Sequence, residues 1–522
     1  MKLRPEGRMT PRTGSAALLL VLAGAAMPSA TTAQELPTWT GLLEAEIQRV
    51  MEALEIPGLG IAVVKGNQVV LARGYGLREV GRPEPVDENT LFAVGSTSKA
   101  FTAAAMGMLV DEGKVRWDDP ATLHLPELQL HDPYVTRHIT VRDLLSHRSG
   151  LGRRADALWY GTRYDRAELL RRIRYLEPLP SGFRGGMGYQ NIMYLAAGEV
   201  VGRVTGTTWD DFVKERIFVP LGMSTSGSSP LDLPPGGNVA MPHVRRDGSV
   251  VTVPYRNLDN VGPAGSINSS VSEMARWVRM LLNGGEFEGE RLFSDSTHRE
   301  LFQPNVVSPV PPQLTAATGI HFRFYGLGWV VEDYRGRFVA WHNGGIDGMH
   351  AQVALLPSEG VGVVVLVNYT GTGVPEALAY RVLDLHLGEA LDRDWVGEQI
   401  QGVEASRQAV AQVEQRMEES RAPNTRPSLA LSAYGGSYQN DLYGRVTIRE
   451  EGGLLVLEDF AGRSATLEHW HHDTFRAAWA DPMMGQSFVS FQLSAGGRPS
   501  RLIADAFQPG DFIRVPGEGM PR

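Results

Sequence analysis

The sequence contains no cysteine, and only five of its 50 basic residues are lysines. The absence of cysteine excludes disulfides, cysteine-ligated zinc and a thiol nucleophile. After the N-terminal region, no segment is apolar enough to span a membrane. The lysines are Lys2, Lys65, Lys99, Lys114 and Lys214. In a chain that so prefers arginine, a lysine on an apolar helix is better explained by function than by solubility.

The N-terminal region has the pattern of a secretory signal peptide. Basic residues are followed by an apolar stretch over residues 16–27 and by the small-residue sequence Thr31-Thr32-Ala33. The apolar stretch is shorter than the roughly 20 residues that a membrane-spanning helix needs. We therefore expect a signal peptide over residues 1–33 and an exported protein, periplasmic or secreted, without a stable transmembrane anchor after cleavage. An uncleaved anchor is the alternative.

Acidic residues outnumber basic ones, and the formal net charge is −9. Residues 1–33 carry a net charge of +3, so removal of the signal peptide would make the chain more acidic still. This balance argues against nucleic acid and anionic membranes as partners.

The pattern of apolar residues predicts an α+β fold followed by a small all-β barrel. A helix over residues 42–53 and a hairpin over 60–73 begin an antiparallel sheet, and a mostly helical region covers about 118–277. Strand patterns return at residues 329–333, 338–342, 350–356 and 362–367, and the last is a continuous apolar run typical of a buried strand. We expect one domain over residues 38–390, a helical linker over 391–427 and a barrel domain over 428–520.

The segment Ser96-Thr97-Ser98-Lys99 lies where an apolar helix over about residues 96–111 begins. Residues three apart share a helix face, so the Lys99 amine can reach the Ser96 hydroxyl and, with a lowered pKa, accept its proton. The unpaired N–H groups at the helix start can stabilise an oxyanion. Ser-x-x-Lys alone is a loose pattern, but the scarcity of lysine strengthens it here.

Two further segments carry candidate polar groups. Tyr189-Gln190-Asn191 follows a glycine-rich stretch and precedes a helix over about residues 192–204. Its alternative interpretation is a packed loop tyrosine with Asn191 as a helix cap. Trp341-His342-Asn343-Gly344-Gly345 ends a predicted strand, with glycines where a substrate can approach the backbone. There the alternative is a hydrogen-bonded histidine at a strand end.

Together, and in this order, the three segments resemble the motifs of the serine β-lactamase-like family, in particular the branch of class C β-lactamases, D-alanyl-D-alanine carboxypeptidases, D-aminopeptidases and related esterases. The resemblance covers about residues 38–390 and includes the stretches at 139–151, 220–223 and 265–269. The C-terminal region is similar to the lipocalin-like barrel that some members carry.

The resemblance implies roles for the motif residues. Ser96 would be the acylated nucleophile, Lys99 and Tyr189 would share the acid and base work, and Asn191 would hold the substrate carbonyl. The N–H groups of Ser96 and Gly345 would form the oxyanion hole. His342 and Gly344 would complete the substrate-binding strand.

One departure from the family pattern bears on the substrate. No lysine follows Lys214, so His342 stands where β-lactamases usually have a cationic lysine. A histidine is largely neutral at pH 7. We therefore expect an exported serine hydrolase acting on amides or esters, with peptides of D-amino acids favoured over β-lactams. A class C-type β-lactamase and a non-catalytic penicillin- or peptidoglycan-binding protein remain the alternatives.

The expected partner is a small-molecule or peptide substrate, with peptidoglycan-derived fragments as one candidate class. We expect no cofactor and no metal. The weaker possibility of a metal site rests on His469 and His471, which would share one face of a strand.

Overall fold

The computed structural model describes residues 39–388 and 393–516. The expected signal peptide over residues 1–33 lies outside this range. None of the described helices is both long and apolar enough to cross a membrane.

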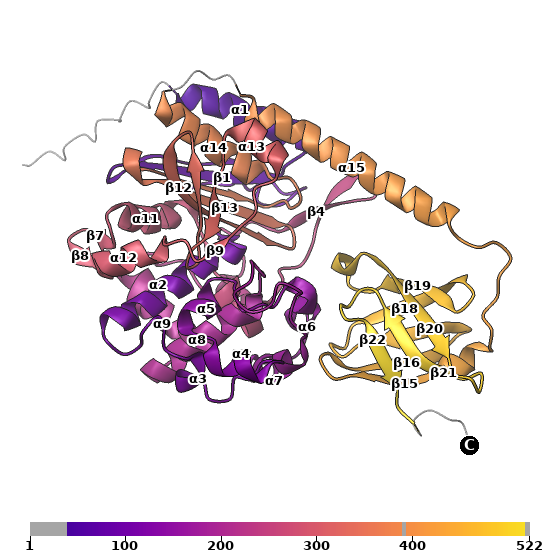
Figure 1. Ribbon diagram of the computed structural model, residues 1–522. Coiled ribbons are helices and arrows are strands. Elements are labelled where there is room, and N and C mark those ends of the chain that lie inside the picture. Colours follow the sequence, from indigo (N-terminus) through magenta and orange to yellow (C-terminus); the bar gives the residue numbers. More distant parts are fainter. Residues whose placement is uncertain (1–38, 389–392, 517–522) are drawn as a thin grey trace, which may run out of the picture. The chain divides into compact units, whose positions relative to one another are not determined.

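An antiparallel sheet of eight strands organises the first half of the fold (Figure 1). Its strands, in spatial order, are β2 (Gln68–Gly76), β1 (Gly58–Lys65), β14 (Val361–Val367), β13 (Met349–Leu356), β12 (Arg337–Ile346), β11 (Val330–Tyr334), β10 (Arg323–Tyr325) and β9 (Val306–Val307). The expected apolar strand is β14, all of whose residues are buried. The third motif lies at the end of β12, as expected, and the strand continues one residue beyond it to Ile346.

Both faces of the sheet are covered, and the two-residue period of a strand divides its side chains between two cores. In β1, Ile61 and Val63 belong to the core beneath α1 (Thr40–Leu54) and α14 (Val374–Leu387). Ala62 and Val64 belong to the core on the other side, with residues of α2 (Ser98–Asp111) and α11 (Val271–Leu282).

The helical region that faces the sheet is built around α2 and α8 (Asn191–Thr205), whose residues are mostly buried. The shorter helices are α3 (Ala121–His124), α4 (Pro133–His138), α5 (Val141–Leu145), α6 (Asp156–Trp159), α7 (Arg166–Arg172), α9 (Trp209–Val213), α10 (Val219–Leu221), α12 (Asp295–Leu301) and α13 (Pro312–Thr318). Three two-stranded sheets pair β3 (Phe92–Ala93) with β6 (Asn268–Ser269), β4 (His243–Arg246) with β5 (Ser249–Thr252), and β7 (Glu286–Phe287) with β8 (Glu290–Arg291).

The helix α15 (Trp395–Glu419) precedes a closed barrel, as the sequence predicts. The barrel strands are β15 (Gly436–Asn440), β16 (Gly444–Glu451), β17 (Leu454–Glu458), β18 (Ser464–His471), β19 (Thr474–Trp479), β20 (Gln486–Leu493), β21 (Pro499–Ala504) and β22 (Asp511–Arg514). The strand register shifts between His469 and His471, so the even spacing assumed for these two side chains is interrupted. Within residues 39–388 and 393–516, no group of three or more histidine, cysteine, aspartate or glutamate side chains is arranged to hold a metal ion.

Candidate active site

Ser96 and Lys99 lie at the start of α2, as expected. A 3₁₀ turn over Gly95–Thr97 leads directly into the helix. The Ser98 hydroxyl secures the turn by donating to Gly95 O at 2.7 Å. One turn separates the serine from the lysine, and Lys99 Nζ lies 3.0 Å from Ser96 Oγ.

Lys99 is fully buried, and its amine has three oxygen neighbours. Besides Ser96 Oγ, these are Asn191 Oδ1 at 2.8 Å and Ala264 O at 2.7 Å. Burial, followed by the positive charge of Arg153, holds the pKa of Lys99 well below its ordinary value. The amine donates to Asn191 Oδ1 and Ala264 O, and its lowered pKa favours the transfer of the Ser96 proton to it when the serine attacks.

Tyr189 contacts the same hydroxyl from the other side. Its Oη lies 2.9 Å from Ser96 Oγ, and burial raises the pKa of Tyr189 to about 12. The phenol therefore keeps its proton at neutral pH and donates it. Lys99 and Tyr189 are thus separated into a base and an acid.

Asn191 is the first residue of α8 but not its cap. The side chain of Gln190 caps the helix by accepting from Ile192 N at 3.0 Å. Asn191 is free for the site, where its amide oxygen receives the Lys99 hydrogen bond and its Nδ2 lies 3.4 Å from Asp156 Oδ1.

The backbone of β12 passes directly against the turn that carries Ser96. Gly95 has a φ of 54°, and a Cβ on this residue would lie 2.9 Å from Gly345 N. A Cβ on Gly344 would overlap Val94 O and lie 2.9 Å from Ser96 N, whereas one on Gly345 would meet open space. The two N–H groups assigned to the oxyanion hole therefore belong to backbones in close contact.

The edge of β12 beside the nucleophile is open. Its neighbour β11 pairs with β12 only as far as Trp341, while β12 continues to Ile346. Among the residues that the structure describes, no strand pairs with 342–346 on this edge. An extended substrate can therefore lie along it.

His342 does not reach the cavity. It is 2% exposed, with its Nε2 3.0 Å from Tyr325 Oη and its Nδ1 2.6 Å from Asn343 O. Since a carbonyl only accepts, Nδ1 carries the proton and Nε2 accepts from Tyr325. Burial and the nearby Lys99 lower the pKa of His342 to about 3, so it is neutral. A contact between this ring and a substrate was expected, but the structure buries the ring and does not place it among the residues that line the cavity.

A cavity of about 270 Å³ opens over Ser96. Four of the seven predicted site residues line it, namely Ser96, Tyr189, Asn191 and Gly345. Lys99, His342 and Gly344 are not among the lining residues. The lining residues are Gly95, Ser96, Arg153, Asp156, Trp159, Tyr189, Asn191, Leu258, Val261, Ala264, Gly265, Asn343, Gly345, Ile346 and His350. A larger cavity of about 770 Å³, which Ser224 helps to line, contains none of the motif residues.

Arg153, Asp156 and His350 were not predicted from the sequence. Arg153 begins a 3₁₀ turn of three residues, Asp156 begins the short helix α6, and His350 is the second residue of β13, so no periodic pattern marks them. Burial raises the pKa of Asp156, whose Oδ1 accepts from Trp159 Nε1 at 2.8 Å.

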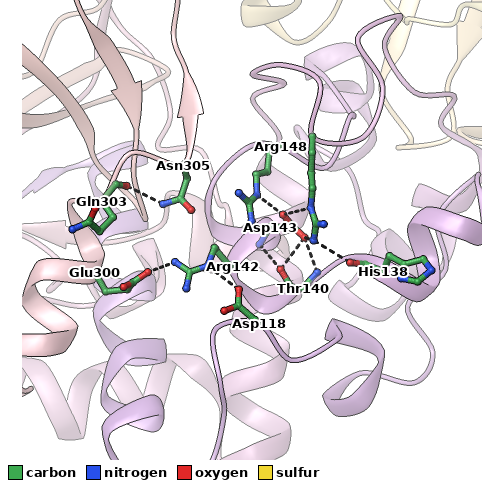
Figure 2. A network of polar contacts seen from close by, with 10 residues as sticks. Asp118, His138, Thr140, Arg142, Asp143, Arg148, Glu300, Gln303 and Asn305 are labelled. Atoms are coloured by element: carbon green, nitrogen blue, oxygen red, sulfur yellow. Dashed lines mark hydrogen bonds and ion pairs between the residues drawn. The ribbon is translucent and has the colours of Figure 1, made fainter.

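The buried carboxylate of Asp143 lies within a network of polar contacts (Figure 2). Asp143 Oδ2 accepts from Arg184 at 2.6 Å and from Thr140 N at 2.9 Å, and its other oxygen accepts from Arg148. Burial alone would raise the pKa of Asp143, but these hydrogen bonds and charges outweigh it and lower the pKa. The network joins the glycine-rich stretch before Tyr189 to the segment of His147, whose ring lies 4.0 Å from that of Tyr189.

The loop that carries Arg153 is also hydrogen-bonded to barrel residues. Tyr443 Oη donates to Arg154 O at 2.8 Å, and Tyr164 Oη donates to Tyr443 O at 2.7 Å. Arg463 donates to Tyr160 O at 2.7 Å. One wall of the cavity is therefore fastened to the C-terminal region.

Comparisons with known proteins show the family to which the chain belongs. The family model Beta-lactamase matches residues 43–387, and a domain of unknown function (DUF3471) matches residues 420–512. The chain is 30% identical over 434 residues to unguisins hydrolase ungD' of Aspergillus campestris, covering 79% of this chain and 78% of that protein. It is 28% identical over 331 residues to penicillin-binding protein 4 of Amycolatopsis lactamdurans, covering 60% and 81%.

A solved structure shares the fold across most of the chain. The octameric penicillin-binding protein homologue from Pyrococcus abyssi aligns with a TM-score of 0.60 and 21% identity over 91% of this chain and 100% of that one. The family match spans the residues that form the site around Ser96, Lys99 and Tyr189. The chain belongs to the β-lactamase family of serine hydrolases and penicillin-binding proteins.

Proposed function

We propose that the protein is an exported hydrolase that forms an acyl-enzyme on Ser96 and cleaves amide or ester bonds, with peptides of D-amino acids as its preferred substrates. The observation that carries the proposal is the position of Ser96 Oγ, 3.0 Å from a buried amine and 2.9 Å from a phenol of raised pKa. The relative named as a hydrolase, 30% identical over most of the chain, supports it.

Acylation begins when Ser96 Oγ attacks the carbonyl carbon and its proton moves to Lys99 Nζ. The oxyanion is held by the N–H groups of Ser96 and Gly345. As the bond to the leaving group breaks, Tyr189 donates its proton to the leaving nitrogen or oxygen and is reprotonated by the Lys99 ammonium. In deacylation, water attacks the ester, and its proton returns through the same groups to Ser96.

Hydrolysis of β-lactams ranks below peptidase or esterase action because the third motif has His342 in place of the lysine that is usual in β-lactamases. His342 is neutral and both of its ring nitrogens are bonded within the protein. A lysine in that position would attract the carboxylate of a β-lactam or of a peptide, and this chain has none there.

The test is to incubate the purified protein with a fluorophosphonate probe and, separately, with a fluorescent penicillin, and to map the labelled residue by mass spectrometry. We expect the probe on Ser96, no label in Ser96→Ala, and normal labelling of Ser224→Ala, which alters an exposed hydroxyl of the larger cavity. Rapid turnover of penicillin would favour a β-lactamase. Absence of both labels from the folded protein would favour a binding protein and refute the proposal.

A further inference from the structure

Arg256 lies at the centre of a polar cluster outside the groups that contact Ser96. Its Nε donates to Asp347 Oδ2 at 2.7 Å, and its Nη2 donates to Tyr160 Oη at 3.2 Å. The Tyr160 hydroxyl lies 2.7 Å from each oxygen of Asp347, and the guanidinium carbon lies 4.5 Å from the centroid of the Tyr160 ring. A Cβ on Gly161, whose φ is 63°, would lie 3.0 Å from Arg256 Nη1, so a glycine lets the chain after Tyr160 pack against the guanidinium.

Each of the three clustered side chains adjoins a different part of the cavity lining. Ile346 directly precedes the aspartate, Trp159 directly precedes the tyrosine, and Leu258 follows the arginine by two residues. All three of these neighbours line the cavity over Ser96. The cluster therefore ties the turn that follows β12, the strand of Gly345, to two other walls of the cavity.

Burial makes these contacts hard to give up. Asp347 is buried, and a buried carboxylate that loses its partner is strongly destabilising. Burial, followed by the charge of Asp347, raises the pKa of Tyr160, so its hydroxyl keeps its proton and donates to that carboxylate. Burial alone would lower the pKa of Arg256, but the carboxylates of Asp347 and Asp481 outweigh it and raise the pKa. The turn is thus held by a charged pair and a neutral donor.

The barrel supplies the second carboxylate to this guanidinium. Asp481 lies between β19 and β20, in the region that matches the domain of unknown function, and its Oδ2 is 2.9 Å from Arg256 Nη2. Both side chains are only 17% exposed, so solvent screens the pair less than it screens a surface pair. Asp481 Oδ1 also accepts from Met483 N at 2.9 Å, which fixes the carboxylate at the start of a 3₁₀ turn.

We propose that Arg256 is a positioning residue for the reaction at Ser96, which holds the turn after β12 and with it the N–H of Gly345, and that the barrel strengthens this hold through Asp481. The inference rests on the proposed function and goes beyond it, since it gives the C-terminal barrel a part in the geometry of the oxyanion hole. Neither Arg256 nor Asp481 lines the cavity, so both act through the residues that do.

The test measures the rate of Ser96 labelling over a range of fluorophosphonate concentrations, which separates the maximal rate from the affinity for the probe. Arg256→Gln should lower the maximal rate by about 10- to 100-fold with little change in affinity, because a shift of about 1 Å in a catalytic group costs on the order of 100-fold. Arg256→Lys should recover part of the rate.

The barrel side of the contact is tested by Asp481→Asn. Asparagine still caps the 3₁₀ turn, so this variant removes only the charge, and we expect a fall of about 2- to 5-fold, the range for a partly exposed ion pair. Asp511→Asn is the matched control, because this barrel carboxylate pairs with Arg501 of the barrel. It should be labelled at the wild-type rate.

The double variant shows whether the two residues act through one contact. Once Arg256 is replaced by glutamine, adding Asp481→Asn should slow labelling no further. Thermal denaturation checks that each variant folds; if Arg256→Gln does not, Arg256→Lys takes its place in the cycle. Wild-type rates in the folded Arg256 variants, or equal slowing by Asp481→Asn with and without Arg256, would overturn the inference while the proposed function stands. Absence of label on Ser96 of the wild type would refute the proposed function instead.

Discussion

Replacing Gly344 by alanine tests whether the close approach of β12 to the nucleophile is needed for catalysis. The φ of Gly344 lies outside the left-handed region, so alanine adds no backbone strain of that kind. The new Cβ would instead overlap Val94 O and lie 2.9 Å from Ser96 N. The effect of the substitution is therefore local and steric.

The size of the effect follows from these contacts. A carbon and a carbonyl oxygen approach no closer than about 3.3 Å, so β12 and the turn at Ser96 must separate by roughly 1 Å. That movement pulls Gly345 N and Ser96 N apart from the geometry that holds one oxyanion. A misplacement of about 1 Å costs on the order of 100-fold in rate, and loss of one oxyanion donor costs about 100- to 1,000-fold. We expect a fall of at least 100-fold in the acylation rate of Gly344→Ala.

The adjacent glycine provides a matched control. A Cβ on Gly345 meets no atom within 4 Å, so Gly345→Ala should acylate within a few-fold of the wild type. The assay is the rate of Ser96 labelling by a fluorophosphonate, with thermal denaturation to show that both variants fold. Equal rates for Gly344→Ala and the wild type would refute the assignment of this strand to the oxyanion hole.

Three other outcomes are expected. Asp143→Asn should lower stability by about 3–5 kcal/mol at neutral pH, because it leaves Arg184 and Arg148 without their buried partner. The folded pKa of Asp143 lies below its ordinary value, so its contribution is present above about pH 4 and disappears on acidification; denaturation from pH 3 to 7 should show the two proteins converge at low pH. Tyr189→Phe should slow cleavage of amides by about 100-fold or more while affecting activated esters less, since their leaving groups need no proton, and equal losses for both would contradict the acid role. A chain ending near Ser428 should still be labelled on Ser96, because no barrel residue contacts the Ser96 hydroxyl among the described hydrogen bonds, and loss of labelling in a folded truncation would show otherwise.

The local part of the site could be predicted from the sequence because helix geometry fixes it. Residues three positions apart lie side by side on any helix, and this places Lys99 Nζ 3.0 Å from Ser96 Oγ. The strands and the barrel were predicted for the same reason, since alternation and turn residues are local signals. Tyr189 and Gly345 needed the family resemblance, because they meet Ser96 only through tertiary structure.

The sequence could not predict whether the His342 side chain would face the cavity over Ser96 or the protein interior. Alternation along β12 divides residues between two faces, but the pattern does not say which face meets a cavity. Buried Tyr325 accounts for the outcome, since its hydroxyl gives the ring nitrogen a partner inside the protein. Arg153 was missed for a different reason, because a charged residue in a turn of three residues has no pattern that separates a binding group from a solvated one.

Burial accounts for the different roles of Lys99 and Tyr189 beside Ser96. Removing a group from water disfavours its charged form, so the same burial lowers the pKa of Lys99 and raises that of Tyr189. The nucleophile therefore lies between a lysine of lowered pKa and a tyrosine of raised pKa, and burial lowers the pKa values of His342 and His147 in the same way. The exposed charge of Arg153 lies at the edge of this group, where it further lowers the pKa of Lys99 and can still meet a substrate. Because the resting hydroxyl carries no charge, negative charge develops only on the attacked carbonyl, where the N–H groups of Ser96 and Gly345 stabilise it.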